Sequence, residues 1–575
     1  MYIKYHRNQK SLDFEDKTNY RLGLAGGDYR PTWLVRVSDW KKVPGQEAVD
    51  GYHTLSYCWG QSGEIVKRND NSEEYDCIDN GYHCIVEYVK KRKPRNFFRH
   101  TIKKYVKYDE LLQQVCKDFQ VEYVWYDKLC IDQLDNEIKL KQIKEMHKVY
   151  RNARCTVAMV PELHSLIPKH FENKDYQHGT WSRLFAVLDL YDSHWMKRSW
   201  TLEEVMMSKR ILFVGTDINM IQHSLHTTDF PTVVDLFSDT LLDFGGENRE
   251  KGSINQALSQ AHFRTSTKPH DMIFALVNTF AHMFDDIDLN YDTDIGTTFN
   301  TFYRTIATRD LSILCFGSNQ LTNGAIESKS TMGNYSLPSW TGVDGHHAYD
   351  RVDSTIHPSL KYNIEIDDMC MYITTSCYWD ISIVPYDGGC FSSSIANKYV
   401  TNTFSNHAHR INVARLKGRE INMKTAGKNT VLQEWDVNIS NVCCFMTHYH
   451  KPSPGSHSQI RPLSLTEDCK ACIVLPILLK LYKSVYSTTV ECSFGGYEHS
   501  YFLPVFRKSF DGTGRYKAVG IYYVGDDANS ESHTFNWNHC VDRDDVCPEK
   551  QPEEILNILF ESNHHGSVPE EFVIE

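Results

Sequence analysis

The stretch "DELLQQVCKDFQVEYVWYD" at residues 109–127 decides the fold class, because it reads as a helix followed at once by a strand. We predict the helix over residues 109–120 and the strand over residues 121–127. Before them, "YHTLSYCWG" at residues 52–60 reads as a strand that ends in a glycine turn. After them, "NEIKLKQIKEMHKVYRNA" at residues 136–153 reads as a second helix. Strand and helix therefore alternate along this part of the chain.

The second helix carries one apolar stripe, formed by Leu140, Ile143, Met146 and Tyr150. Further strands are predicted at residues 155–160 ("CTVAMV") and 211–215 ("ILFVG"), with a helix at residues 181–192 between them. Strands that alternate with helices form a parallel sheet with helices on both faces. We therefore predict an α/β fold, with a parallel sheet flanked by helices, in the N-terminal half of the chain.

The whole chain has 575 residues, which is too long for one ordinary domain, so we expect two or three. We place an N-terminal extension at residues 1–48, the α/β domain at 49–220, a helical connector at 221–310 and a β-rich C-terminal domain at 311–575. The last region has runs of β-branched and aromatic residues separated by Gly, Asn and Asp, which is typical of strands in a sandwich or a barrel.

Composition excludes several classes of protein. The hydrophobic fraction of 41% and the charged fraction of 24% are ordinary for a globular chain. A net charge of -12 argues against a general nucleic-acid binder. No apolar run approaches the roughly 20 residues that a membrane helix needs, and the N-terminal residues lack the apolar core of a signal peptide. We expect a cytoplasmic protein without a membrane segment.

The 17 cysteines are scattered and odd in number, so we expect reduced thiols rather than disulfides. One cluster has the residue types of a tetrahedral zinc site, with ligands drawn from Cys443, Cys444, His448, His450, Cys469 and Cys472. The stretch "NVCCFMTHYH" in this cluster also reads as a strand, in which alternate residues face opposite sides. We favour the strand and predict no metal site.

A long insertion at residues 61–108 separates the first strand from the first helix. Its second half, residues 89–107, contains nine Lys and Arg residues and no acid. Clustered cations attract phosphates, so this stretch is a candidate polyanion-binding patch. The alternative is a solvated hairpin or helix whose charge is balanced by the acid-rich residues 69–76, and we favour that alternative. Nucleic acid is not an expected partner.

Three segments are expected to meet at one edge of the predicted sheet, because ligands of parallel sheets lie outside the carboxyl ends of the strands. The first strand delivers "SYCWG" to that edge, and the second delivers Asp127. A third segment, "WMKRSWTLEE" at residues 195–204, contributes from the side. Aromatic rings, a cation and two carboxylates suit a polar ligand that contains a ring. The candidate ligand-binding residues are Ser56, Tyr57, Trp59, Gly60, Arg198 and Trp200, and the candidate catalytic residues are Glu204 and Asp127.

Each candidate also has a purely structural interpretation. Trp59 and Trp125 are more often core residues than stacking platforms, and Asp127 equally suits the cap of a turn. Cys130 lies between two apolar residues and is interpreted as a buried thiol, since no adjacent base suggests a lowered pKa. Glu204 lies one helical turn from Trp200 and can instead form a structural ion pair with Arg198.

The ordered blocks "LSYCWG" (55–60), "WYDKLCIDQ" (125–133) and "WMKRSWTLEE" (195–204) resemble the heterokaryon-incompatibility (HET) domain of filamentous fungi. A later stretch, residues 264–277, resembles the element that commonly follows this domain. The chain departs from the pattern at Lys128, where a small residue is usual, and at Glu203, where glutamine is usual. Because Glu203 stands beside Glu204, two carboxylates compete for one role.

The resemblance implies a role in non-self recognition that leads to growth arrest or cell death. HET domains look distantly similar to TIR domains, so a TIR-like (flavodoxin-like) fold is implied. The stretch "WTLEEV" is similar to the TIR helix that carries the catalytic glutamate of NAD-cleaving members, and the match falls on Glu204. A fixed carboxylate stabilises the positive charge that develops on the ribose when nicotinamide leaves, as in glycoside hydrolysis. NAD is then a substrate, and no cofactor is expected.

Two expectations about partners follow. The resemblance to TIR enzymes implies self-association through the HET domain, together with a protein partner that activates it. The alternative function is a non-enzymatic interaction module in incompatibility signalling, in which Glu204 is structural. Loss of nicotinamide release on Glu204→Gln substitution separates the two, because an exposed ion pair contributes only about 0–1 kcal/mol.

Overall fold

The computed structural model contains two compact units. The first unit consists of Met1–Gly252 and Arg264–Thr293, and the second consists of Ser253–Phe263 and Asp294–Glu575. The structure describes residues 6–7, 10–11, 28–59, 65–67, 75–77, 81–92, 97–163, 193–208, 210–216, 219–223, 254–262, 264–280, 284, 290–318, 332, 335–347, 352–356, 360–365, 369–375, 378–384, 413–418, 436–439, 442–446, 459–462, 472–481, 501–524 and 569–575.

A nine-stranded sheet organises the first unit, in the order β2-β1-β13-β12-β11-β5-β10-β3-β4. Its strands are β1 (His6–Arg7), β2 (Lys10–Ser11), β3 (Trp33–Arg36), β4 (Lys41–Pro44), β5 (His53–Ser56), β10 (Tyr123–Trp125), β11 (Cys155–Met159), β12 (Arg210–Val214) and β13 (Asn219–His223). The central strands β12, β11, β5 and β10 are parallel to one another, whereas β13 pairs antiparallel to β12, and β3 pairs antiparallel to both β10 and β4. The prediction of a parallel sheet is confirmed for this centre, and antiparallel strands extend it at both edges.

The helices of the first unit include those predicted over residues 109–120 and 136–153. They are α2 (Tyr108–Phe119), α3 (Asp127–Cys130), α4 (Asn136–Lys144), α5 (Met146–Asn152), α7 (His194–Lys197), α8 (Ser199–Met207) and α11 (His270–Thr279). The single helix predicted over residues 136–153 is divided at Glu145 into α4 and α5. The helix predicted over residues 181–192 lies outside the described residues.

Strand β5 is buried on both of its faces, and different helices cover them. On one face, the ring of His53 packs edge-on against Phe119 of α2. Thr54 and Ser56 point to the opposite face. There Ser56 donates a hydrogen bond to Glu204 of α8, and the Thr54 hydroxyl bonds with the Thr156 hydroxyl of β11. Because successive residues of a strand point to opposite faces, this alternation explains why β5 combines apolar and hydroxyl side chains although all four residues are buried.

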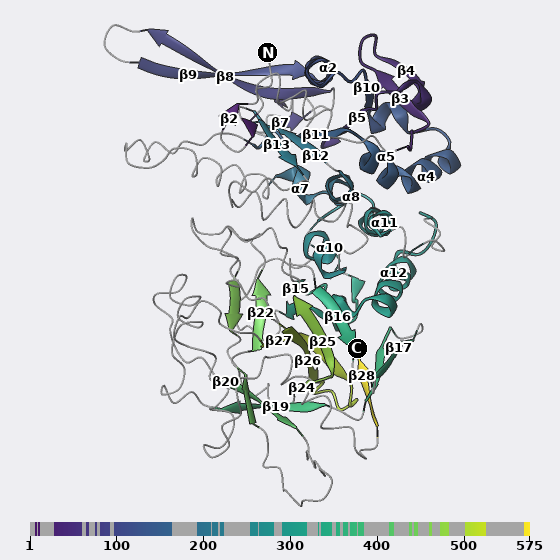
Figure 1. The fold of residues 1–575 in the computed structure, drawn as a ribbon, viewed down its shortest axis with the longest axis vertical. Coiled ribbons are helices and arrows are strands. Elements are labelled where there is room, and N and C mark those ends of the chain that lie inside the picture. Colours follow the sequence, from purple (N-terminus) through teal and green to yellow (C-terminus); the bar gives the residue numbers. More distant parts are fainter. Residues whose placement is uncertain are drawn as a thin grey trace, which may run out of the picture. The chain divides into compact units, whose positions relative to one another are not determined.

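The insertion between β5 and α2 contains a long hairpin. Strands β8 (Tyr82–Arg92) and β9 (Phe97–Lys107) pair antiparallel over their whole length and form a separate two-stranded ribbon (Figure 1). A second short pair joins β6 (Ile65–Lys67) to β7 (Tyr75–Cys77). At the base of the ribbon, the ring of His83 is buried and lies 3.1 Å from the carbonyl of Gly215. The basic stretch therefore belongs to a hairpin, one of the two forms expected for it.

The second unit is rich in strands, as predicted for the C-terminal half. A 13-stranded sheet contains β16 (Val352–Ile356), β17 (Lys361–Ile364), β18 (Met371–Thr375), β19 (Trp379–Val384), β20 (Val413–Gly418), β21 (Asp436–Ile439), β22 (Val442–Met446), β23 (Gln459–Pro462), β24 (Cys472–Val474), β25 (Ile477–Leu481), β26 (Tyr501–Lys508), β27 (Tyr516–Val524) and β28 (Glu570–Ile574). A separate pair consists of β14 (Phe316–Ser318) and β15 (Gly345–His347). Helices α10 (Ile254–Ala261) and α12 (Ile295–Arg309) belong to this unit.

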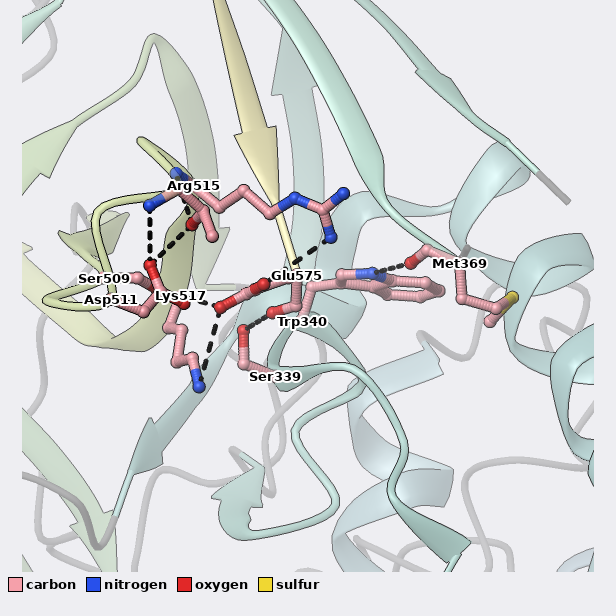
Figure 2. A network of polar contacts seen from close by, with 9 residues as sticks. Ser339, Trp340, Met369, Ser509, Asp511, Arg515, Lys517 and Glu575 are labelled. Carbon is pink, nitrogen blue, oxygen red and sulfur yellow. Dashed lines mark hydrogen bonds and ion pairs between the residues drawn. The ribbon is translucent and has the colours of Figure 1, made fainter. Parts of the chain in front are cut away.

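Glu575 connects β28 to three other parts of the second unit (Figure 2). Its backbone N–H donates to Tyr516 in β27, and its carbonyl accepts from the backbone N–H of Ser339. Its carboxylate accepts a 2.9 Å hydrogen bond from Ser509 and lies 3.7 Å from Arg515 and 3.6 Å from Lys517. These contacts hold β28 against the sheet.

Among the described helices, none is both long enough and apolar enough to cross a membrane.

Candidate functional site

The site is built around Ser56, the last residue of β5 and a neighbour of the carboxyl end of β10. The Ser56 hydroxyl donates a short hydrogen bond to the Glu204 carboxylate on α8. The indole N–H of Trp195 on α7 donates to the same Ser56 oxygen at 2.7 Å. The side chains of Ser56, Trp195 and Glu204 are all buried. The glutamate is therefore fixed against the carboxyl edge of the sheet by a buried relay of two hydrogen bonds.

The electrostatic surroundings of Glu204 give its carboxyl an unusual acidity. Burial raises the pKa of Glu204 to about 7, while the hydrogen bond from Ser56 and the charge of Arg198 act in the opposite direction. The charge of Asp127 raises the pKa of Glu204 further, and a hydrogen bond from Tyr150 lowers it. Near neutral pH, Glu204 can therefore exist with or without its proton, which is the property needed in a group that exchanges protons.

Arg198 links α8 to the residue that follows β5. Its guanidinium donates a 2.9 Å hydrogen bond to the carbonyl of Tyr57. Arg198 also forms the N-terminal boundary of α8, and no side chain there caps the helix. The cation lies close enough to Glu204 and Asp127 to lower the pKa of both. It therefore favours the ionised form of each acid.

Asp127 is the second carboxylate of the site. It is the first residue of α3, directly after β10, and accepts hydrogen bonds from the indole N–H of Trp59 at 3.0 Å and from the backbone of Lys128 at 2.7 Å. Burial raises the pKa of Asp127, and the bond from Trp59 opposes that shift. Trp59 remains 42% exposed, so its interpretation as a core residue is wrong. Trp125 is a core residue, as expected, and packs edge-on against Tyr150.

Glu203 points away from the sheet, although it directly precedes Glu204. It is fully buried and accepts a 3.1 Å hydrogen bond from Asn278 of α11. Its other carboxyl oxygen, Oε1, is buried without a hydrogen-bond partner. Burial raises the pKa of Glu203 well above its ordinary value and so favours its protonated, neutral form. A protonated carboxyl resembles a glutamine amide in charge and shape, which explains how glutamate occupies a position where glutamine is usual.

A line of hydroxyl groups continues from α8 into the sheet. The Ser208 hydroxyl donates to the carbonyl of Glu204 and lies 2.5 Å from the Thr156 hydroxyl in β11. Thr156 in turn lies 2.7 Å from the Thr54 hydroxyl in β5. These contacts extend from the end of α8 across the two central strands. They satisfy the buried hydroxyls and fix the register of α8 over β5 and β11.

The cysteines near the site are unsuited to nucleophilic attack. Burial raises the pKa of the Cys58 thiol, which follows Tyr57, to about 12. Burial also raises the pKa of Cys130 to about 12, in agreement with its interpretation as an inert buried thiol. A thiolate is the reactive form of cysteine, and neither residue forms it near neutral pH.

The structure brings together most of the predicted site residues. One hydrogen bond joins Ser56 to Glu204, a second joins Arg198 to the carbonyl of Tyr57, and a third joins Trp59 to Asp127. The Ser56 hydroxyl donates to Glu204 and accepts from the indole N–H of Trp195. Trp200 is half-buried and takes no part in these hydrogen bonds. Gly60 lies outside the described residues.

Sequence reasoning missed several residues that complete the site. Trp195 was overlooked in favour of Trp200, although the indole N–H of a buried tryptophan usually needs an acceptor. Tyr150 is predicted only as part of an apolar stripe, but its hydroxyl donates to the carbonyl of Leu55 at 3.4 Å and lowers the pKa of Glu204. Asn278 and Arg264 follow the predicted site by more than 50 residues, and no local pattern connects them to it.

The candidate zinc cluster lies partly within the described residues. Cys443 and Cys444 lie on β22, so the strand interpretation of this stretch is confirmed. His448, His450 and Cys469 lie outside the described residues. Within the parts of the chain that are described, no group of three or more His, Cys, Asp or Glu side chains could hold a metal ion.

Comparison with known families agrees with the position of this site. Residues 52–204 match the family described as Heterokaryon incompatibility protein (HET), and the matched segment runs from the residue before β5 to Glu204 itself. The chain has no significant match among curated proteins or among solved structures. The match covers less than half of the chain, and Ser56, Asp127, Arg198 and Glu204 lie within it, whereas Arg264 and Asn278 do not. Residues 52–204 therefore form a heterokaryon-incompatibility (HET) domain.

Proposed function

We propose that this HET domain protein hydrolyses the bond between nicotinamide and ribose in NAD, with Glu204 as the catalytic carboxylate, and that this activity drives a cell-death response. The observation that carries the proposal is the state of Glu204. It is a buried carboxyl with a pKa of about 7, held at the carboxyl end of a parallel strand and facing a cation. Groups with such shifted pKa values concentrate at functional sites.

The reaction balances without a cofactor. A water molecule adds to the anomeric carbon of the ribose as the bond from that carbon to the pyridinium nitrogen breaks. The electron pair of the broken bond returns to the ring nitrogen, so nicotinamide leaves as a neutral molecule. The water loses one proton, and ionised Glu204 accepts it. The products are nicotinamide, ADP-ribose and that proton.

Each residue of the site has a separate role in this reaction. Ionised Glu204 stabilises the positive charge that develops on the sugar as the bond breaks. Ser56 and Trp195 hold its carboxyl in one orientation, which keeps the cost of reorganisation low. Arg198 keeps part of the Glu204 population ionised at neutral pH and supplies a cation for a phosphate group. The exposed ring of Trp59, fixed by Asp127, offers a face for an aromatic base.

The topology of the sheet supports the implied TIR-like fold. When the four central parallel strands are numbered along the chain, their order across the sheet is 4-3-1-2, which is the flavodoxin-like order 2-1-3-4 read from the other edge. In such sheets the strand order reverses beside the first strand, and ligands bind at the carboxyl ends there. Ser56 ends that first strand, β5, so Glu204 is fixed at the edge where a ligand is expected.

The test is nicotinamide release from NAD by the full-length protein, compared with its Glu204→Gln variant. Glutamine keeps the size of the side chain and can still accept the Ser56 hydrogen bond, but it carries no charge. We expect the rate to fall by about 10³-fold or more, the scale seen when a catalytic electrostatic contact is removed. Glu203→Gln is the matched control, and we expect its rate to stay within threefold of wild type. Equal rates for wild type and Glu204→Gln would exclude Glu204 from catalysis.

A second candidate function is docking to another protein, and one observation favours it. Large apolar side chains are exposed beside the site on α3, on α4 and in the loop between them: Leu129 is 38% exposed, Leu134 97% and Ile138 46%. Such residues suit self-association or the binding of an activating partner. If docking alone transmits the signal, Leu134→Asp abolishes the cell response while Glu204→Gln does not. Light scattering of both variants then shows whether a second copy of the chain is the partner.

A further inference from the structure

The segment Arg264–Thr293, called the returning segment below, belongs to the first unit although the residues on both sides of it belong to the second. It lies outside residues 52–204, which match the HET family. It nevertheless contacts the helix that carries Glu204. Its first part forms a backbone pairing with the junction between α7 and α8, and its helix α11 packs against α8.

Backbone hydrogen bonds connect the returning segment to the start of α8. The N–H of Ser199, the first residue of α8, donates to the carbonyl of Thr265 at 3.0 Å. The N–H of Thr265 donates to the carbonyl of Lys197, the last residue of α7, at 2.6 Å. Because α8 has no side-chain cap at Arg198, this pairing satisfies an N–H group that the helix leaves open.

The Arg264 side chain adds a second connection at the same place. Its guanidinium donates hydrogen bonds of 2.9 Å to the carbonyl of Arg198 and to the hydroxyl of Thr201 in the first turn of α8. Only 1% of Arg264 is exposed. A planar guanidinium with several fixed donors is suited to hold two acceptors in a set geometry. Arg264 therefore holds the backbone carbonyl of Arg198, and the side chain of Arg198 in turn extends to Tyr57 in the site.

Helix α11 of the returning segment contacts α8 at Glu203. The Asn278 amide donates to the Glu203 carboxyl at 3.1 Å and to the carbonyl of Ile143 at 2.9 Å. Every residue of α11 from Asp271 to Thr279 is buried. A helix as short as α8, with nine residues, is not stable by itself and depends on such packing for its position.

We propose, building on the proposed role of Glu204, that the returning segment completes the site and that Arg264 is a positioning residue for Glu204. Arg264 fixes the first turn of α8, and that turn directs Arg198 toward Tyr57 and Glu204 toward Ser56. Without Arg264, the start of α8 moves, Arg198 loses its place beside Glu204, and the carboxyl holds its proton more tightly. The HET domain defined by residues 52–204 alone is therefore an incomplete site.

The experiment compares Arg264→Met with Arg264→Lys in the full-length chain. Methionine keeps most of the side-chain volume but donates no hydrogen bond, whereas lysine retains the charge and one donor group. For Arg264→Met we expect amide hydrogen exchange of α8 to accelerate at least tenfold relative to that of β11. We also expect kcat for nicotinamide release to fall at least tenfold with KM within threefold, and its pH midpoint to rise. Arg264→Lys should recover much of the lost kcat and return the midpoint toward that of wild type.

Arg210→Met is the matched control, since Arg210 is another buried arginine of the first unit and interacts electrostatically with His53 and Cys155. It should lower thermal stability without moving the pH midpoint. The proposal is overturned if Arg264→Met accelerates exchange equally in α8 and β11, or if the Glu204 titration is unchanged. If wild type releases no nicotinamide, the proposed function fails, but exchange and the Glu204 titration measured by infrared spectroscopy still decide the role of Arg264.

Discussion

The two sides of α8 place adjacent glutamates in different chemical settings. On the side facing α11, Glu203 meets one amide and no cation, and it is buried completely. On the side facing the sheet, Glu204 meets a hydroxyl and lies within the field of Arg198. Burial raises the pKa of both carboxyls, but only for Glu204 does a cation, Arg198, lower the pKa again. Burial without a nearby cation raises the pKa of Glu203 well above its ordinary value, whereas burial beside a cation gives Glu204 a pKa of about 7.

The comparison also shows why neighbours in a helix take separate roles. Successive residues point about 100° apart around the helix axis, so adjacent side chains do not share a face. Asn278 therefore reaches Glu203 without disturbing the bond between Glu204 and Ser56. One helix can in this way be anchored on its outer side and present a reactive group on its inner side.

The largest expected effect is on the pH dependence of stability. Each acid has a folded pKa above its unfolded value, so stability is greatest at low pH and falls as pH rises between the two values. For Glu204, with values of 4.5 unfolded and about 7 folded, the total loss is about 3 kcal/mol and is complete above pH 8. For Glu203, burial also raises the folded pKa well above 4.5, so its contribution to stability likewise falls as the pH rises.

Urea unfolding of wild type, Glu204→Gln and Glu203→Gln from pH 5 to pH 9 measures this difference. Both variants should be more stable than wild type at high pH, because each removes one acid that opposes folding there. Both gains should grow as the pH rises above 5, and the gain from Glu204→Gln should level off above pH 8. A variant whose stability relative to wild type does not change with pH would show that burial does not raise the pKa of the carboxyl that it replaces.

The second expected effect is on activity. If ionised Glu204 is the reactive form, kcat/KM for nicotinamide release should rise tenfold per pH unit below about pH 7 and become constant above it. The rate at pH 5 should be about 100-fold below the plateau. Glu203→Gln should leave the midpoint in place. A profile that is flat from pH 5 to pH 8 would contradict the assignment.

A smaller effect is expected from Ser56→Ala. The variant removes the hydrogen bond to Glu204 and leaves the buried indole N–H of Trp195 without its acceptor, which costs about 1–3 kcal/mol of stability. Because the Ser56 bond lowers the pKa of Glu204, its loss should move the pH midpoint of activity upward. Ser208→Ala, which changes a hydroxyl that bonds to the Glu204 backbone instead, is the control and should not move the midpoint.

The smallest effect should distinguish the two tryptophans of this segment. Trp195→Phe removes a fully buried donor to Ser56, so we expect a loss of activity of about tenfold, equivalent to about 1.4 kcal/mol. Trp200 is only half-buried, and Trp200→Phe should change activity by less than threefold. Steady-state rates of the two variants, compared at pH 8, check this order.

The centre of the fold could be predicted because its signals are local. The helix at Tyr108–Phe119 and the strand at Tyr123–Trp125 lie close to the boundaries that residues 109–127 suggest. Alternation of strand and helix then led to the parallel centre of the sheet. The antiparallel edge strands β3 and β4 could not be placed, because the pairing of β3 with β10 joins segments more than 80 residues apart in the chain, and β4 is attached to the sheet only through β3.

The site could be predicted only as far as residue types allowed. Carboxylates, an arginine and tryptophans in ordered blocks led to Glu204, Asp127 and Trp59. Trp195 could not be singled out, because helical spacing favours Trp200 and does not show which ring reaches Ser56. The different states of Glu203 and Glu204 depend on Asn278 and Arg198, whose distances no sequence pattern reports.

The most direct test of the central claim is the titration of Glu204 itself. Infrared difference spectra of the full-length protein, recorded from pH 5 to pH 9, detect a carboxyl group as it loses its proton. We predict one buried carboxyl that titrates near pH 7, that disappears in Glu204→Gln and that persists in Glu203→Gln. A signal near pH 7 that survives in Glu204→Gln, or a Glu204 already ionised at pH 5, would contradict the account.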